Sequence, residues 1–194
     1  MNSILTQTAN WAGVTLVISG GQTGADQGGL IGARQAGVRT GGTAPSGFYT
    51  DAGPNLLLET FGLIAEGDYR SRTVKNVKNS SGTVLLTCTL DSPGSYLTRN
   101  EARRQGKAFF ERDINDIVDA FNQGENPAQA IKDVSTEIQR WVISHEIEIL
   151  NVAGNRERHR NFATARIVAA IIKDVLLNLH GEGLVSSDGV QREP

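Results

Sequence analysis

The residues that point most clearly to chemistry are small and polar, and they follow three predicted strands. They are Gly20-Gly-Gln-Thr-Gly24, Ser92-Pro-Gly-Ser95 and Asn151-Val-Ala-Gly154. Glycine lets a phosphate or another oxyanion approach the backbone, and the free N–H groups at a helix start attract negative charge. Ligands of open α/β sheets bind beyond the carboxyl ends of the strands. The three segments therefore predict one composite pocket for a phosphorylated or oxyanionic molecule. The alternative is that they are ordinary turn residues.

A few nearby side chains are candidates to complete such a pocket. Gln22 and Thr23 project from the first loop and are predicted to donate hydrogen bonds to an oxyanion. Asp26 lies in the first turn of the next predicted helix, where it either compensates the helix dipole or binds a ligand hydroxyl or amine. Arg72 and Arg156 are the arginines predicted to reach the pocket, because a guanidinium binds anions with several N–H groups at once.

Several familiar kinds of site are excluded. The first loop is not G-x-G-x-x-G, and no acidic residue follows about twenty positions later, which disfavours a redox dinucleotide fold. It also lacks the Gly-Lys-Ser/Thr of a Walker loop. The three scattered histidines and the single Cys88 show no zinc-ligand spacing, and no G-x-S-x-G nucleophile elbow is present. We therefore predict neither a metal site nor a catalytic residue.

The composition is that of an ordinary globular protein. The chain has 194 residues, of which 39% are hydrophobic and 21% charged, enough for one domain with a buried core. A formal net charge of −2 disfavours nucleic-acid binding, which needs a basic surface. No apolar stretch is long enough for a bilayer, and no charged leader precedes an apolar run, so we expect a cytoplasmic protein without a membrane partner.

Strands and helices alternate along the chain. The predicted strands are 15–19, 83–87, 107–110 and 147–150, and the predicted helices are about 25–36, 95–105, 127–145 and 162–179. Residues 40–53 predict a long surface loop and residues 55–64 a short helix. The alternation implies a Rossmann-like, three-layer α/β sandwich with a mostly parallel sheet. We expect an N-terminal extension at 1–13, a ligand-binding domain at 14–181 and a flexible C-terminal tail at 182–194.

Several motifs occur in the order of a known family. They are Ser19-Gly-Gly-Gln-Thr-Gly-Ala-Asp-Gln-Gly-Gly29, Gly41-Gly42 with Pro45-Ser-Gly47, Arg72-Thr73 with Asn76-Val77, Ser92-Pro-Gly-Ser95 with Leu97-Thr98, and Asn151-Val-Ala-Gly154. On these motifs the chain resembles, over about residues 15–179, the molybdenum carrier proteins, which are circularly permuted YpsA-like members of the SLOG superfamily. The resemblance implies a Rossmann-like homo-oligomer, often a tetramer, that binds molybdenum cofactor (molybdopterin) or molybdate. A carrier of this kind would have a molybdoenzyme or an insertase as its partner.

The resemblance also implies which residues bind the ligand. They are Gly21, Gln22, Thr23, Gly24, Asp26, Arg72, Asn76, Ser92, Gly94, Ser95, Thr98, Asn151, Gly154 and Arg156. The chain departs from the family pattern at Asn155, where a proline usually precedes the arginine. It also has Ser81 where an acidic residue is usual.

A second resemblance leaves an enzyme open as the alternative. Pro93-Gly-Ser-Tyr-Leu-Thr98 with Glu101 is similar to a degraded P-G-G-x-G-T-x-x-E motif of nucleotide phosphoribohydrolases. Glu101 would then stabilise a ribosyl cation or activate water; otherwise it is a solvent-facing carboxylate. Ser95 and Leu97 replace two glycines that let the backbone wrap a phosphate, which suggests binding without hydrolysis. We therefore predict a non-catalytic storage or carrier protein for molybdenum cofactor, the alternatives being a nucleoside monophosphate hydrolase and a nucleotide-derivative sensor.

Overall fold

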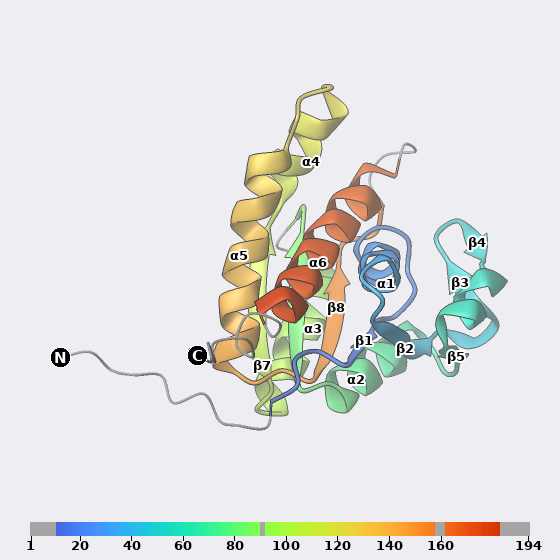
Figure 1. Cartoon of the computed structure of the whole chain (residues 1–194). Coiled ribbons are helices and arrows are strands. Elements are labelled where there is room, and N and C mark those ends of the chain that lie inside the picture. Colours follow the sequence, from blue (N-terminus) through green and yellow to red (C-terminus); the bar gives the residue numbers. More distant parts are fainter. Residues whose placement is uncertain (1–10, 90–91, 158–161, 183–194) are drawn as a thin grey trace, which may run out of the picture.

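The computed structural model describes residues 11–89, 92–157 and 162–182. Six parallel strands form the main sheet, in the order β5-β2-β1-β8-β6-β7 (Figure 1). Their bounds are β1 Leu16–Ile18, β2 Arg39–Ala44, β5 Leu63–Ala65, β6 Gly82–Thr87, β7 Ala108–Asp113 and β8 Ile149–Gly154. Most of the predicted N-terminal extension and nearly all of the predicted C-terminal tail lie outside the described residues.

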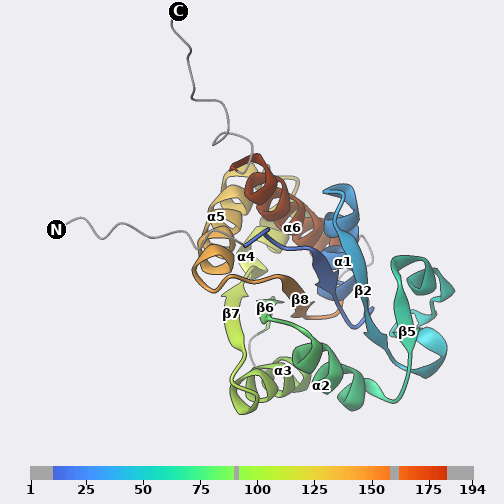
Figure 2. The same cartoon turned by 60° about the horizontal axis from the view of Figure 1, so that its bottom comes forward.

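Helices cover both faces of the sheet. One face carries α1 (Ala25–Gln35), α4 (Asn115–Asn122), α5 (Ala128–Ser144) and α6 (Ala163–Glu182), with α6 packed against the other three. The opposite face carries α2 (Tyr69–Asn79) and α3 (Pro93–Arg104), which pack against each other (Figure 2). The predicted three-layer α/β sandwich with a parallel sheet is confirmed.

The core lies where the central strands meet α6. Val84, Leu86 and Val152 are 0% exposed on β6 and β8, and the apolar face of α6 packs against them. Its buried members are Ile167, Val168, Ile171, Ile172, Val175 and Leu176. Each such side chain contributes about 1.5–3 kcal/mol when removed from water. This apolar face of α6 therefore holds in place the layer that carries α1 and the loop before it.

The predicted surface loop at 40–53 is wrong at its start. Residues 39–44 form β2, which pairs with β1 on one side and β5 on the other. Its Thr-Gly-Gly-Thr sequence lacks an apolar pattern because the neighbouring backbone is very close. A Cβ on Gly42, whose φ is +123°, would lie 2.3 Å from the carbonyl oxygen of Ser19. The glycines thus reflect tight strand packing and not a loop.

The segment that follows β2 is also more structured than predicted. A small hairpin pairs β3 (Tyr49–Thr50) with β4 (Gly53–Pro54). The predicted helix at 55–64 is a short 3₁₀ helix, η2 (Leu56–Phe61), capped by the Asn55 side chain and ended by Gly62 in the left-handed region. The strand β5 then follows directly. A separate short 3₁₀ turn, η1 (Ser46–Phe48), leads into the hairpin.

Two helices have no counterpart among the predicted elements. Helix α2 begins at a capping box in which the Asp68 carboxylate accepts a hydrogen bond from the amide of Ser71, and the Ser71 hydroxyl accepts one from the amide of Asp68. Its sequence mixes lysine, arginine and asparagine, which hides the helical period. Few apolar residues are needed, because only one face of the helix touches the sheet. Helix α4 is the other; Val118 is its buried residue.

The third predicted turn, Asn151–Gly154, is part of a strand. These residues complete β8 and pair with β6. Gly154 stands opposite Leu86 in the register, and a Cβ there would lie 1.9 Å from the Leu86 carbonyl oxygen. The requirement for glycine at this position comes from the contact between two strands, and the chain turns only after it.

Replacing Gly154 with alanine tests this contact. We expect Gly154→Ala to lower the free energy of unfolding by about 1–3 kcal/mol, because overpacking at a backbone contact forces the strands apart. Gly94→Ala is the control, since a Cβ there meets no atom within 4 Å; it should leave stability unchanged or raise it by up to about 1 kcal/mol. Urea unfolding measures both, and equal values for the two variants would contradict the packing argument.

Candidate functional site

A cavity of about 580 Å³ opens beyond the carboxyl ends of β1, β6 and β8. We call it the strand-end cavity. It is lined by Gln22, Tyr69, Arg70, Arg72, Thr73, Thr89, Ser92, Pro93, Gly94, Leu97, Gly154, Asn155 and Arg156. Its volume lies within the usual range of small-molecule sites, about 300–1,000 Å³. Segments far apart in the sequence therefore meet at the edge where a parallel sheet binds ligands.

The loop between β1 and α1 is held by a buried carboxylate. Asp26 is 2% exposed, and its Oδ2 accepts hydrogen bonds from the amide of Gln22 at 3.2 Å and from Nη1 of Arg72 at 2.9 Å. The amide of Gly20 also donates to this carboxyl group. Asp26 thus occupies the position that a bound anion was predicted to take on this loop.

Two further amides in this segment are used within the protein as well. The amide of Thr23 donates to Oε1 of Gln22 at 2.9 Å, and the amide of Ala25 donates to the carbonyl oxygen of Asn155 at 3.0 Å. The expectation that the Gly20–Gly24 amides cradle a phosphate stays a prediction, although the amides of Gln22 and Thr23 already have partners within the protein. The glycines give close packing, and at Gly24 a Cβ would lie 2.5 Å from the Asn155 carbonyl oxygen.

Arg72 brings a cation to the cavity from α2. Its guanidinium lies against Gly20, where a Cβ would come within 1.5 Å of Nη1. Its Nε is buried and has no hydrogen-bond partner among the described residues. Because Asp26 fixes one end of the guanidinium, Arg72 presents the rest of its N–H groups in one orientation.

A second arginine stands at the rim. Nη1 of Arg156 contacts both carboxylate oxygens of Asp51, at 2.8 and 2.7 Å. Asp51 lies between β3 and β4, and its amide donates to Oε1 of Gln22 at 2.9 Å. The side chains of Arg156 and Asp51 are 64% and 37% exposed, so the pair is worth only about 0–1 kcal/mol. Arg156 can exchange this partner for an anionic ligand at little cost.

The start of α3 forms another wall of the cavity. Ser92 caps this helix, and its Oγ accepts a hydrogen bond from the amide of Ser95 at 3.1 Å. Pro93 has no N–H group, and the amide of Gly94 has no partner in the part of the chain that the structure describes. The Gly94 amide and the helix dipole therefore favour an anion at this point.

Asn155 connects these walls, although the sequence marked it only as a departure from the family pattern. Its Oδ1 accepts hydrogen bonds from the amides of Cys88 at 2.6 Å and Thr89 at 2.9 Å. Its Nδ2 donates to Oγ of Ser92 at 3.2 Å. The side chain thus ties the end of β6 to the start of α3, a role that only tertiary contacts show.

The predicted ligand residues fall into two groups. Those that line the strand-end cavity are Gln22, Arg72, Ser92, Gly94, Gly154 and Arg156. Those that do not line it are Gly21, Thr23, Gly24, Asp26, Asn76, Ser95, Thr98 and Asn151. Lining residues that were not among the predicted ligand residues are Tyr69, Arg70, Thr73, Thr89, Pro93, Leu97 and Asn155. The capping pattern Asp68-x-x-Ser71 is the one sequence signal that could have placed Tyr69 and Arg70 on the helix of Arg72.

Two of the predicted ligand residues have clear structural roles instead. Asn76, 2% exposed, accepts a hydrogen bond from the amide of Thr43 at 2.8 Å and donates to its carbonyl oxygen at 3.0 Å, which joins α2 to β2. Nδ2 of Asn151 donates to Oγ1 of Thr83 at 3.1 Å inside the sheet. Both side chains satisfy buried polar groups, and neither lines the strand-end cavity.

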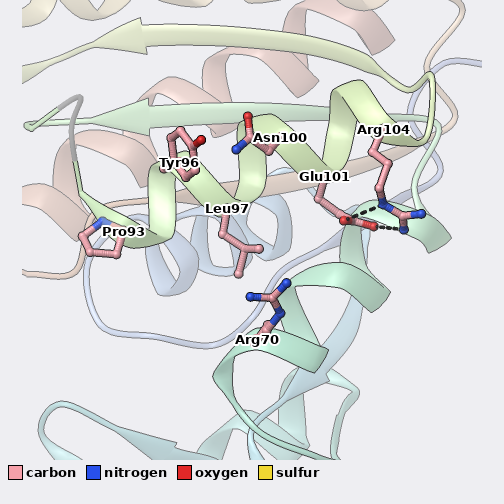
Figure 3. A pocket seen from close by; sticks show the side chains of 7 residues that line it. All are labelled: Arg70, Pro93, Tyr96, Leu97, Asn100, Glu101 and Arg104. Carbon is pink, nitrogen blue, oxygen red and sulfur yellow. Dashed lines mark hydrogen bonds and ion pairs between the residues drawn. The ribbon is translucent and has the colours of Figure 1, made fainter.

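Glu101 is neither solvent-facing nor in the strand-end cavity. It is buried and paired with Arg104 through two hydrogen bonds, Nε to Oε2 at 3.1 Å and Nη2 to Oε1 at 2.5 Å (Figure 3). Gln105 donates to Oε1 as well. The hydrogen bonds from Arg104 hold the pKa of Glu101 below its ordinary value, so the group is a paired carboxylate.

The described residues hold neither a metal-ligand cluster nor a membrane-spanning helix. No group of three or more histidine, cysteine, aspartate or glutamate side chains is placed to hold a metal ion there. Within the same residues, every helix is too short or too polar to cross a membrane.

Asp26→Asn tests the electrostatics of the loop. Burial raises the pKa of Asp26 above its ordinary 3.8, while Arg72 and the two amides oppose the shift. The folded protein therefore keeps this proton at pH values where the unfolded chain loses it. This stabilisation is complete below about pH 4 and is lost as the pH rises through the folded pKa, so wild type should lose stability relative to Asp26→Asn in that direction.

Urea unfolding of both proteins at a series of pH values measures the difference. Because the variant keeps every other titrating group, their separate effects cancel. If the free energy of unfolding of wild type instead rises relative to that of the variant as the pH rises, the attraction of Arg72 outweighs the cost of burying the carboxylate.

Comparison with known proteins agrees with the resemblance found in the sequence. Residues 17–176 match the family described as "Circularly permutated YpsA SLOG family". A solved structure, "Putative molybdenum carrier protein" from Syntrophus aciditrophicus SB, is 32% identical, with a TM-score of 0.67 over 87% of this chain and 95% of that one. A search of curated proteins finds no match. The chain belongs to the circularly permuted YpsA family of the SLOG superfamily.

Proposed function

We propose that this protein binds and carries a small phosphorylated or oxyanionic molecule, namely molybdenum cofactor, and does not transform it. One observation carries the proposal: among the described residues, the strand-end cavity is lined by three arginines, Arg70, Arg72 and Arg156, and by no aspartate or glutamate. A cavity with this lining attracts negative charge at the sheet edge that α/β proteins use for ligands.

The anionic end of the ligand lies between α3 and α2 in this proposal. The amide of Gly94 and the hydroxyl of Ser92 contact it from one side, and Arg72 contacts it from the other. Hydrogen bonds between an ionised donor and an ionised acceptor are about twice as strong as neutral ones. Arg156 leaves Asp51 and adds the outermost contact, while the Gly20–Gly24 loop supports the site from behind without binding the anion.

Molybdenum cofactor fits this set of donors and agrees with the family. The cofactor carries a phosphate and metal-bound oxygens, and molybdate is itself an oxyanion. The described lining offers N–H and hydroxyl donors, and it contains neither cysteine nor histidine. Cys88, the single cysteine, is 5% exposed and outside the lining. The protein therefore holds this cargo through its oxygens. The name of the structural neighbour supports a molybdenum ligand here.

The alternative enzyme has weaker support. A hydrolase needs a carboxylate that can reach the sugar or a water molecule. Both oxygens of Glu101 are taken by Arg104 and Gln105, and Glu101 does not line the strand-end cavity. The geometry therefore favours a carrier over a nucleotide hydrolase.

Titration with several ligands tests the proposed function. Purified protein is titrated anaerobically with molybdenum cofactor, and separately with molybdate, AMP and GMP, while chromatography monitors release of the base. We expect saturable binding of the cofactor and no base release. Base release that disappears in Glu101→Gln would overturn the carrier in favour of the hydrolase, and failure to bind any of the four would overturn both.

Arg156→Gln tests the contact at the rim. Loss of one charged hydrogen-bond donor should weaken cofactor binding about tenfold, or about 1.4 kcal/mol. Stability should be almost unchanged, because the ion pair with Asp51 is exposed. Isothermal titration calorimetry measures the affinity, and urea unfolding measures the stability.

Lys75→Gln is the matched control, because it also removes one positive charge near the site. Lys75 lies on α2, pairs with Glu66 and does not line the cavity. It should change the affinity less than about twofold at physiological salt. Equal losses of affinity in both variants would mean that the ligand responds only to the overall positive charge of this region and not to a contact with Arg156. Asp51→Asn should have the opposite effect to Arg156→Gln and strengthen binding, since it frees Arg156.

A further inference from the structure

A second cavity, of about 500 Å³, lies between α2 and α3 beside the strand-end cavity (Figure 3). We call it the helix cavity. It is lined by Arg70, Pro93, Tyr96, Leu97, Asn100, Glu101 and Arg104. Arg70, Pro93 and Leu97 line both cavities. The two cavities therefore share a wall, and a ligand bound in one lies next to the other.

The two cavities differ in chemistry. The strand-end cavity has the Gly94 amide, two hydroxyl-bearing threonines and most of the arginines. The helix cavity has an apolar side formed by Pro93, Tyr96 and Leu97, of which Pro93 and Leu97 belong to the shared wall. Tyr96 is 63% exposed, although an aromatic side chain gains most by being covered. The arrangement suits a molecule with an anionic end and a flat apolar body.

Arg70 stands at the boundary between them. Figure 3 shows its guanidinium, on α2, facing Leu97 across the gap to α3. It is attracted to Glu101 over a distance and forms no hydrogen bond or ion pair within the described residues. A cation at this position can contact a ligand either at its anionic end or along its apolar body.

The distance along α3 from the strand-end cavity into the helix cavity matches the length of a mononucleotide. The Gly94 amide and Asn100 are six residues apart on α3, which at 1.5 Å per residue is about 9 Å. A phosphate joined through a short linker to a fused ring system spans a distance of this order, whereas inorganic phosphate or molybdate does not. Asn100 can donate to and accept from the edge of such a ring.

We propose that the helix cavity is the ring subsite of the same ligand, so that the protein selects phosphorylated fused-ring heterocycles, the class of pterin phosphates and purine nucleotides, over bare oxyanions. This rests on the proposed function. The ring lies against Tyr96 and Leu97, and Asn100 hydrogen-bonds to its edge. The ion pair between Glu101 and Arg104 closes the far end of the subsite.

Ligands with and without the ring test the proposal. Inorganic phosphate and molybdate carry only the anionic end, and GMP and molybdenum cofactor carry both parts. We expect GMP and the cofactor to bind at least about tenfold more tightly than phosphate, the factor typical of one aromatic stacking contact. Tyr96→Ala should remove about five- to tenfold of the GMP and cofactor affinity and leave phosphate affinity unchanged within about twofold.

Tyr49→Ala is the matched control. Tyr49 is also an exposed tyrosine, at 55%, and it lines neither cavity. It should leave all affinities unchanged. Asn100→Ala gives a second, milder variant and should weaken GMP binding without affecting phosphate.

The outcomes separate the two proposals. If phosphate or molybdate binds and the ring adds nothing, or if Tyr96→Ala weakens GMP and phosphate equally, the ring subsite is overturned while the proposed function stands. If no phosphorylated or oxyanionic ligand binds, both fail. If Tyr96→Ala changes only the sedimentation of the protein, a second copy covers this face and the ring subsite is overturned.

Discussion

The site depends on one buried interaction, the contact of the Asp26 carboxylate with Arg72 and with the amides of Gly20 and Gln22. It joins three parts of the chain: the loop after β1, the first turn of α1 and the second turn of α2. A buried charge of this kind is tolerated only when donors surround it. Loss of this contact would free the guanidinium of Arg72, which among the described residues is the one arginine of the cavity lining that has a buried ion-pair partner.

This interaction changes how the glycine-rich loop is interpreted. In many α/β proteins a loop at this position holds phosphate with its amides. Here the amides of Gln22 and Thr23 bind the protein's own side chains, and Gly24 lets the start of α1 come very close to the residues after β8. In our proposal the cations for a ligand come instead from α2 and from the residues after β8, and the amide comes from Gly94 at the start of α3. The proposed anion site thus lies toward the face of the sheet that carries α2 and α3.

Much of the fold could be predicted from sequence, since β6 and α6 carry apolar patterns with the period of their structure. Residues 39–44 could not, because Gly42 of β2 is required by a contact with Ser19, directly after β1, that exists only in the folded protein. The rule for strand ends led to the edge of the sheet where the strand-end cavity lies. Which amides are free there could not be predicted, because that depends on where a carboxylate such as Asp26 lies. Asn155 shows the same limit: its role comes from three partners more than 60 residues away in the chain.

The most direct test is a crystal structure of the protein soaked in molybdate, with the anion located from the anomalous scattering of molybdenum. Our account predicts a peak within hydrogen-bond distance of Arg72 and the Gly94 amide, with Asp26 still bonded to the Gly20–Gly24 loop. A peak on the amides of that loop, with Asp26 displaced, would contradict the account.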